Sequence, residues 1–396
     1  MDWIETARAA LREAGLDAWL LYDFRGGNPI ARARIAPLLD GGVASRRVFL
    51  LVPVDGPPLL LVHAIERGSI PELPFEVRAY TSRESLERAL RGLLAGRERV
   101  AMEYSPGGDN PYVGTVDAGT VELVRSLGVE VVSSGDVAQS SEVWTSRQLE
   151  AHLEAADAVL AAKDQAFAFL GERLALGQEV HETEVQRLIA SYFDARGMVF
   201  DHPPNVSFGA HAGDPHYVPR VGEDAYVRAG DVVLIDLWAR LDEDGAPYAD
   251  VTWTGVSGEP SEELTHAFAA VIEARDAAFR AIAEAYAAGR PPEGGAIDRV
   301  ARALLAARGY GDDVFVHRTG HSLGWRRTHG DAAHLDDFET RDRRRLIPGL
   351  GITIEPGVYF PHFGVRSEID VLLEADGPRA TTDLQGELER LPAPPS

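Results

Sequence analysis

Four acidic residues lie in two pairs inside apolar stretches of the second half of the chain. Asp236 lies in VVLIDLWA and Asp250 in YADVTWT, whereas Glu355 lies in GITIEPGVYF and Glu368 in VRSEIDVLL. The spacing within the two pairs is nearly the same. Burying an ionised carboxylate without a partner is costly, so each of these groups is expected to be paired, neutralised or bound to a metal ion.

A histidine in a glycine-rich loop, TGHSLG, adds an imidazole to this set of acids. A single buried aspartate would often be a residue that caps a strand or pairs with an arginine. Two matched pairs of acids together with His321 are harder to explain in that way. Four carboxylates and one imidazole suit a divalent ion such as manganese, cobalt or zinc. The pattern therefore predicts a metal site that contains Asp236, Asp250, Glu355 and Glu368.

The elements that carry these residues are expected to occur twice in the same order. In each copy, two helices precede a loop with a histidine, and two acid-bearing strands follow it. The helices are expected at about 147–176, 182–196, 261–288 and 295–308. The two loops contain Pro215-His216-Tyr217 and HRTGHSLG (317–324). Identity between the copies is slight, but a pseudo-twofold arrangement would bring the two acid-bearing strand pairs face to face.

The part of the chain before this repeat alternates helical and strand patterns. An amphipathic stretch from Ile4 to Ala14 leads into AWLLYD, and the apolar runs VFLLVPV, LLLVHA, RVAMEY and VEVVSS follow. A polar, turn-rich segment at 135–148 separates this part from the first long helix. We therefore expect two domains, an α/β domain over residues 1–140 and a second domain over residues 141–396.

Charge and composition exclude several classes of function. The net charge of −23 argues against a nucleic-acid partner, because phosphate binding needs a positive surface. No apolar run approaches the ~20 residues of a membrane helix. The N-terminus lacks the basic start and apolar core of a signal peptide, which favours the cytoplasm. Cysteine is absent and Lys163 is the only lysine, so thiolate metal sites, cysteine nucleophiles, P-loops and Schiff-base cofactors are not expected.

Five short strings resemble the ligand motifs of the pita-bread metallopeptidases, a family that includes methionine aminopeptidase, aminopeptidase P, prolidase and the metal-free creatinase. The strings are LIDLWAR, YADVTWT, TGHSLG, TIEPGVY and VRSEID, and the similarity covers roughly residues 150–386. The part before it resembles the N-terminal domain that creatinase, prolidase and aminopeptidase P share. The resemblance implies an α/β N-terminal domain followed by an α+β pita-bread catalytic domain with an internal pseudo-twofold repeat.

The resemblance assigns the acids and the histidine to two metal ions. It implies that Asp236 holds one ion alone and that Asp250 and Glu368 bridge both. His321 and Glu355 resemble the ligands of the other ion. A pair of such ions lowers the pKa of a shared water from 15.7 toward ~7, and this water attacks the scissile carbonyl. Glu355 is placed by resemblance to move a proton between the water and the leaving nitrogen.

Three further histidines match positions that face substrate in the family. His216 matches a histidine that contacts substrate near the scissile bond, and His317 matches one that lines the pocket beyond it. His329 resembles the histidine that hydrogen-bonds the reacting carbonyl. It lies one residue further from His321 than is usual, and Gly330 follows it where an acid is usual, so a one-residue bulge is expected. The remaining loop histidines, His211 and His334, are expected at the surface or in loops.

Arg366 shares a strand face with Glu368, because alternate residues of a strand point the same way. Two compatible roles follow: it neutralises the carboxylate cluster, or it captures the substrate's C-terminal carboxylate. Trp253 replaces the arginine of the D-x-T-R-T form of its motif. The separation of Asp236 and Asp250 exceeds the usual one, and the loop at 241–247 absorbs the excess.

The leading interpretation is a prolidase that hydrolyses Xaa-Pro dipeptides with two divalent ions, manganese before cobalt or zinc. An alternative is aminopeptidase P, which releases the residue ahead of proline from longer peptides. Methionine aminopeptidase normally lacks such an N-terminal domain, and creatinase has lost most metal ligands. A non-catalytic binding module on the same fold is the alternative from another class, against which the intact ligand set argues. The relatives also imply a homodimer that acts on small peptides.

Overall fold

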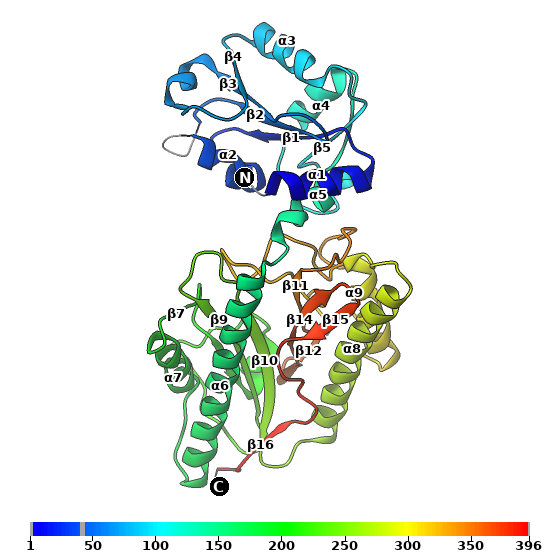
Figure 1. Cartoon of the computed structure of the whole chain (residues 1–396). Helices are drawn as coiled ribbons and strands as arrows, with labels where there is room; N and C mark the ends of the chain where they lie inside the picture. The colour runs from blue at the N-terminus through cyan, green and yellow to red at the C-terminus, as the bar shows by residue number, and fades with distance from the viewer. Residues whose placement is uncertain (1–2, 40–43, 395–396) are drawn as a thin grey trace. The chain divides into compact units, whose positions relative to one another are not determined.

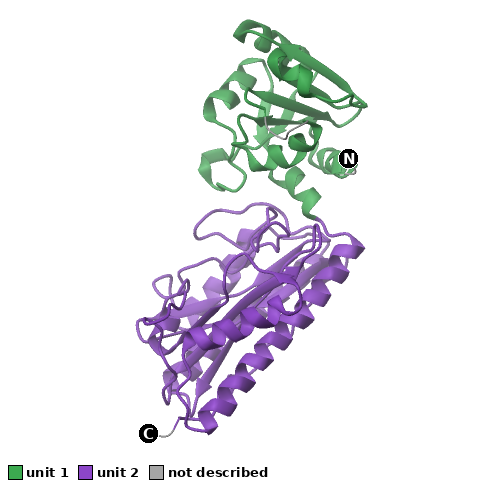
Figure 2. Ribbon diagram, turned by 90° about the vertical axis from the view of Figure 1, so that its left-hand side faces the viewer, with its two compact units in different colours: residues 1–142 green, residues 143–396 purple. Residues whose placement is uncertain are grey.

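The computed structural model describes residues 3–39 and 44–394. The chain divides between Glu142 and Val143 into two compact units (Figure 2). Within the described residues, no helix combines the length and the apolar character that are needed to cross a lipid bilayer.

Unit 1 is a six-stranded mixed sheet with the strand order β4-β3-β2-β1-β5-β6 and helices on both faces (Figure 1). Its elements are α1 (Trp3–Ala14), β1 (Ala18–Asp23), α2 (Pro29–Ile35), η1 (Ala36–Leu38), β2 (Val48–Pro53), β3 (Leu59–His63), η2 (Ala64–Ser69), β4 (Glu76–Tyr80), α3 (Arg83–Leu94), β5 (Arg99–Met102), η3 (Pro106–Gly108), α4 (Ala118–Ser126), β6 (Glu130–Ser133), α5 (Gly135–Gln139) and η4 (Ser140–Glu142). Along β1, alternate residues enter two separate cores: Trp19 and Leu21 pack with α1, whereas Leu20 and Tyr22 pack with α3 and α4. The predicted α/β domain is confirmed.

Unit 2 contains the predicted repeat of elements. Its first half consists of α6 (Ser146–Ala175), α7 (Glu182–Asp194), β7 (Met198–Val199), β8 (Asn205–Phe208), η5 (Gly209–Gly213), β9 (Val232–Leu241) and β10 (Ala249–Ser257). Its second half consists of α8 (Glu262–Ala287), α9 (Gly294–Ala307), β11 (Gly351–Ile354), β12 (Gly357–Phe360), β13 (Phe363–Arg366), β14 (Ile369–Glu374), β15 (Gly377–Ala380) and β16 (Glu389–Leu391). The four helices begin and end within about two residues of the expected bounds.

The strands of unit 2 form three sheets. The order β16-β10-β9-β7, with β8 also paired to β9, describes the first sheet. The second is β11-β14-β15 and the third is β12-β13. The long helices cover these sheets, with α6 against β9 and β10 and α8 against β13 and β15 (Figure 1). Helices α6 and α7 pack on β8, β9 and β10, whereas α8 packs on strands of both halves. The site residues lie on the strands and loops of both halves.

Local sequence explains where the long helices begin. Thr145 is the N-cap of α6, and its side chain accepts a hydrogen bond from the backbone of Gln148, whose side chain in turn accepts from the backbone of Thr145. This capping box satisfies two backbone donors that the first turn of a helix leaves unpaired. Ser261 caps α8 through a bond from Leu264 in the same way.

A cation–π contact joins α6 to β10. The ammonium nitrogen of Lys163, the only lysine, lies 4.0 Å from the centre of the Trp253 ring. The same nitrogen lies 2.6 Å from the Asp164 carboxylate. The tryptophan that replaces the arginine of the D-x-T-R-T motif is thus buried between the helix and the sheet.

Candidate metal centre

The first pair of acids shares one face of the hairpin formed by β9 and β10. The antiparallel register places Thr252 opposite Asp236 and Trp238 opposite Asp250. Alternate residues of a strand point to the same face, so Asp236 and Asp250 both point toward the site. The longer connection at 241–247 therefore lengthens the turn, and Asp236 and Asp250 still point to the same side of the hairpin.

The second pair lies at a break between two β-ladders, which differs from the expectation that each acid lies within a strand. β11 pairs with β14 and β12 with β13, and Glu355 and Glu368 occupy the gap between the two ladders. Pro356 has no N–H to donate across this gap. The backbone N–H of Glu355 donates to Thr319 O (2.7 Å) and that of Glu368 to Thr252 O (3.3 Å). Both glutamates are thereby held against other elements of the site.

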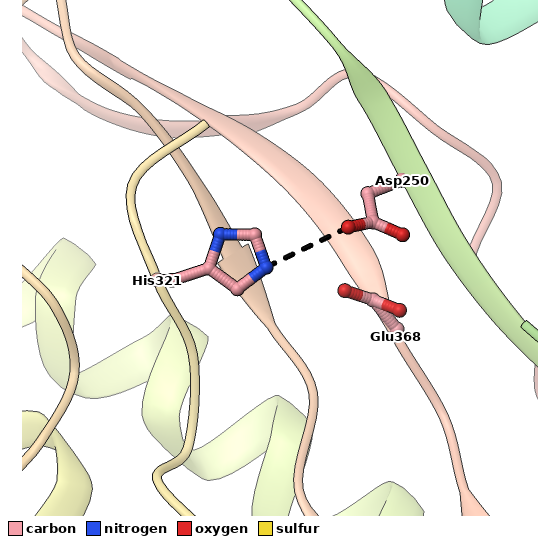
Figure 3. Close-up of side chains that lie close together, drawn as sticks. All are labelled: Asp250, His321 and Glu368. Carbon is pink, nitrogen blue, oxygen red and sulfur yellow. Dashed lines mark ion pairs between the residues drawn. The ribbon is translucent and has the colours of Figure 1, made fainter. Parts of the chain in front are cut away.

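Three of the predicted ligands converge. One side-chain atom each of Asp250, His321 and Glu368 lie within 4.8 Å of one another, and all three residues are buried (Figure 3). His321 Nε2 lies 3.5 Å from Asp250 Oδ2 and 3.6 Å from Glu355 Oε1. Asp236 reaches the same cluster through an ion pair with Arg366. The structure thus places three of the five sequence-predicted ligands in one buried group, with Asp236 and Glu355 beside it and partly exposed.

The donor atoms of this group fit a metal ion. His321 Nδ1 lies 2.9 Å from Ser322 O, and because a carbonyl oxygen only accepts, Nδ1 carries the ring hydrogen. Nε2 then turns a lone pair toward carboxylate oxygens. Asp250 Oδ1 is buried and has no hydrogen-bond partner among the described residues. Lone pairs that face one another without a hydrogen between them are the arrangement that a cation stabilises.

Burial and mutual repulsion disfavour negative charge in the cluster when no metal is present. Burial raises the pKa of Asp250 and of Glu368 well above the usual range, and neighbouring carboxylates raise both further. Burial also raises the pKa of Asp236 and raises that of Glu355 to about 7, against the opposing effect of Arg366. Divalent cations would offset this crowding of acids.

Arg366 lies at the centre of a hydrogen-bond network among these groups. Its guanidinium contacts Asp236 and donates to Thr252 Oγ1 and to Tyr359 Oη, both at 2.9 Å. Thr252 Oγ1 in turn donates to Glu368 Oε2 at 2.8 Å. The arginine is therefore in contact with the carboxylate cluster, as one of its two expected roles requires. These three contacts use three of its five N–H groups.

His317 joins the same network through Tyr359. Its Nδ1 lies 2.7 Å from Arg318 O and therefore donates, which leaves Nε2 to accept from Tyr359 Oη at 2.8 Å. Sequence reasoning did not single out Tyr359 or Thr252. The period-of-two pattern contains a signal for Thr252, because it lies two residues after Asp250 on the same strand face. The tyrosine ends TIEPGVY and had no such signal.

His216 lies in an exposed loop that a buried glutamate anchors. Glu182, the first residue of α7, accepts hydrogen bonds from Tyr217 Oη (2.7 Å) and Ala225 N (2.8 Å) and pairs with His211 Nδ1 (3.0 Å). The His211 ring also stacks on Tyr217, with ring centres 4.3 Å apart. His211 lies in η5 and is partly exposed, and the contacts of Glu182 hold the chain on both sides of His216.

The start of the same loop packs closely on β12, which gives a testable expectation. A Cβ atom at Gly213 would lie 2.1 Å from the backbone oxygen of Phe360. Because a backbone atom cannot rotate away, Gly213→Ala is expected to displace the loop, to destabilise the protein by about 1–3 kcal/mol and to lower kcat/KM. Urea unfolding and peptide hydrolysis measure the two effects.

Gly171→Ala in α6 is the matched control. A Cβ there meets its nearest neighbour, a side-chain atom of Leu391, at 3.9 Å, which is an ordinary contact. Alanine is favoured over glycine inside a helix by roughly 0.5–1 kcal/mol, so this variant is expected to be at least as stable as the native protein. Equal stabilities of the two variants would show that the loop tolerates a side chain at Gly213.

His329 lies beside His321 at the end of a small turn. The ring centres of the two histidines are 4.0 Å apart. The turn is closed by a bridge between Leu323 and His329 and by a bond from Gly324 N to Thr328 O at 2.9 Å. The longer spacing between the two histidines is accommodated within this turn.

His334 was expected at the surface or in a loop, and it lies in a loop but not at the surface. Its side chain is 0 % exposed, and its Nδ1 accepts a hydrogen bond from Ser322 N at 3.1 Å. Burial lowers the pKa of His334 well below its usual value. The buried His334 therefore supports the backbone next to His321, the predicted ligand.

A comparison with protein-family models matches residues 150–375 to metallopeptidase family M24. The chain belongs to this family. The predicted membership of the pita-bread metallopeptidases is thereby confirmed. The prediction that the protein is a metallopeptidase is confirmed with it. The matched region begins in α6 and ends after β14, so it contains all five predicted ligands.

Known proteins and solved structures are also similar to this chain. The chain is 30 % identical over 273 residues to a protein of Mycobacterium bovis named probable dipeptidase PepE, a match that spans 68 % of this chain and 66 % of that one. The crystal structure of dipeptidase PepE from Mycobacterium ulcerans is 25 % identical, with a TM-score of 0.66 over 99 % of this chain and 98 % of that one. An Xaa-Pro dipeptidase from Bacillus anthracis shares the fold, at 23 % identity and a TM-score of 0.60 over 99 % of both chains.

Proposed function

We propose that the protein is a dipeptidase that hydrolyses Xaa-Pro dipeptides and uses two divalent metal ions, with manganese as the preferred metal. The observation that carries the proposal is the buried group of Asp250, His321 and Glu368, with Glu355 and Asp236 beside it. The M24 relative named a dipeptidase supports cleavage of dipeptides. A homodimer is part of the proposal by resemblance to the family, and light scattering in solution tests it.

The five ligands would hold the ions, and the remaining residues would bind and orient the peptide. When bound, the ions lower the pKa of a water molecule and polarise a carbonyl. Glu355, beside His321, is proposed to carry a proton to the leaving nitrogen. Proline leaves as a secondary amine and needs that proton. His216 and His329 are proposed to contact the peptide on either side of the scissile bond.

Arg366 is proposed to recognise the C-terminal carboxylate of the dipeptide, and His317 is proposed to line the pocket for it. Proline lacks an N–H, so an enzyme selective for it must recognise the ring and the free carboxylate instead. The guanidinium has N–H groups beyond those that contact Asp236, Thr252 and Tyr359. A carboxylate bound at a fixed distance from the scissile bond would exclude a residue beyond proline, because that residue would have to occupy the same place.

The test compares Ala-Pro with Ala-Pro-Ala at equal metal loading. We expect the tripeptide to have a kcat/KM lower by about 30-fold or more, because an amide at that place leaves the cation unpaired at a cost of about 2 kcal/mol. In Arg366→Ala, the preference for Ala-Pro over Ala-Pro-Ala should shrink. Arg366→Lys, which keeps the positive charge, is the matched control. Comparable cleavage of both peptides by the native protein would indicate an aminopeptidase P activity. Binding of peptide without turnover would indicate a non-catalytic binding protein.

A further inference from the structure

A buried arginine contacts the histidine that lies beside the candidate metal centre. Arg318 follows His317 in the loop that leads to the ligand His321, and it is 7 % exposed. Its Nη2 lies 2.8 Å from Nδ1 of His329. This contact joins the beginning of the loop at 317–329 to its end. Neither the predicted metal ligands nor the proposed substrate contacts explain it.

The chemistry of the two groups fixes the direction of this hydrogen bond. A guanidinium carries only N–H donors and stays protonated in proteins, so Arg318 must donate. Nδ1 of His329 must therefore accept with its lone pair. A neutral imidazole carries one ring hydrogen, and with Nδ1 occupied as an acceptor that hydrogen is on Nε2.

The backbone around Arg318 is held in place from several directions. Its carbonyl oxygen accepts from His317 Nδ1 at 2.7 Å. The next residue, Thr319, donates its backbone N–H (3.0 Å) and its hydroxyl (2.7 Å) to the buried carboxylate of Asp298 in α9. Arg302 of the same helix donates to the carbonyl oxygen of His317. The guanidinium therefore extends from a backbone segment that α9 fixes.

The other side of the contact is fixed by a residue of the first half. Asp201, which follows β7, accepts from the backbone N–H of Thr328 (3.3 Å) and from its hydroxyl (3.1 Å). The same carboxylate accepts from Trp238 Nε1 at 2.6 Å. Thr328 directly precedes His329, so the backbone that carries the histidine is tied to β9. The backbone is thus held by other hydrogen bonds on both sides of the Arg318–His329 contact.

We propose that Arg318 is a positioning residue that holds His329 in the tautomer with its hydrogen on Nε2, so that His329 acts as a hydrogen-bond donor beside the metal centre. The effect on catalysis rests on the proposed function. In amide hydrolysis the carbonyl oxygen gains negative charge, and a donor that is already oriented stabilises it. The opposite tautomer would present a lone pair at Nε2 and repel that oxygen.

The first experiment reads the tautomer directly and needs no substrate. Protein labelled with ¹⁵N in histidine and loaded with zinc, which is diamagnetic, is studied by NMR, and the His329→Gln variant identifies the signals of that ring. We expect the native protein to show hydrogen on Nε2 and an unprotonated Nδ1. Arg318→Met should lose this single tautomer, and Arg318→Lys, which keeps a donor, should retain it. Hydrogen on Nδ1 in the native protein, or an unchanged ring in Arg318→Met, would overturn the proposal.

The second experiment is a double-mutant cycle on peptide hydrolysis. Arg318→Met is expected to lower kcat at least about tenfold with a smaller effect on KM, which is the usual scale for a residue that orients an active-site group. If it acts through His329, then Arg318→Met combined with His329→Ala should be no slower than His329→Ala alone. Additive losses would show instead that Arg318 acts on the substrate independently and would overturn the proposal.

Arg326→Met is the matched control for that cycle. Arg326 belongs to the same loop, but its side chain is about half exposed and pairs with Asp331. Its replacement should leave the activity unchanged, and thermal unfolding should show all variants folded. A native protein that hydrolyses no peptide would contradict the proposed function, and the NMR experiment would still decide the tautomer.

Discussion

Glu355→Gln is expected to lower kcat for an Xaa-Pro dipeptide by at least about 100-fold, the scale of a lost proton carrier. The substitution keeps the size of the side chain and removes both its charge and its capacity to accept and release a proton. Glu355 Oε1 lies 3.6 Å from Nε2 of His321, a proposed ligand, so its charge and its proton transfer would both act at the reacting centre. Asp250→Asn should cause a loss of the same order, because Asp250 is proposed to bridge the two ions. Steady-state kinetics together with the metal content of each variant measures both effects.

The control for Glu355→Gln is the same substitution at the surface of the same half. Glu374 at the end of β14 is partly exposed and pairs with Arg379 at 2.7 Å. Glu374→Gln should keep native turnover, because exposed ion pairs contribute little. The metal-free form of Glu355→Gln should unfold no more easily than the metal-free native protein, because a crowded buried carboxylate has been removed. Near-native turnover of Glu355→Gln with two metals bound would refute the ligand assignment.

Removal of metal is expected to abolish activity and to lower the melting temperature. An ion present at 100 times its Kd stabilises the native state by about 2.7 kcal/mol. For a unit of this size, that corresponds to roughly 5–10 °C. Manganese or cobalt should restore activity best, because four carboxylates and one imidazole form a harder set of ligands than thiolates do. Elemental analysis, calorimetry and hydrolysis assays on chelated and reconstituted protein measure these changes.

A ligand-deficient variant separates specific from nonspecific effects of the metal. Asp250→Asn combined with Glu368→Gln removes the two proposed bridging carboxylates and one cause of their mutual repulsion. Its melting temperature should not respond to manganese. Full activity of the native protein with no bound metal would contradict the proposed mechanism as a whole, and a manganese-dependent shift in the double variant would place the ions elsewhere.

Local pattern was sufficient to predict the helices of unit 2 and the strands that carry Asp236 and Asp250. The helical periodicity of the long helices is a property of neighbouring residues, so it can be read in the sequence. The period of two places residues on the faces of each strand, but only the pairing of β9 with β10 brings Asp236 and Asp250 to the same face.

Features that depend on distant partners could not be predicted in this way. The break that holds Glu355 and Glu368 follows from backbone bonds to Thr319 and Thr252, residues that no local pattern connects with them. The same holds for His334, whose burial against Ser322 results from the path of a whole loop. The side-chain positions of the metal centre are a product of tertiary packing, whereas the residue types are visible in the motifs.

The bond between Thr252 and Glu368 has a consequence for the order in which the protein is made. Its two partners are 116 residues apart. At a synthesis rate of about 5–20 residues per second, Thr252 is added to the growing chain roughly 6–23 s before Glu368. During this interval the aspartates of the first half have no glutamate partners. The proposed metal centre can therefore be completed only after the second half has been synthesised.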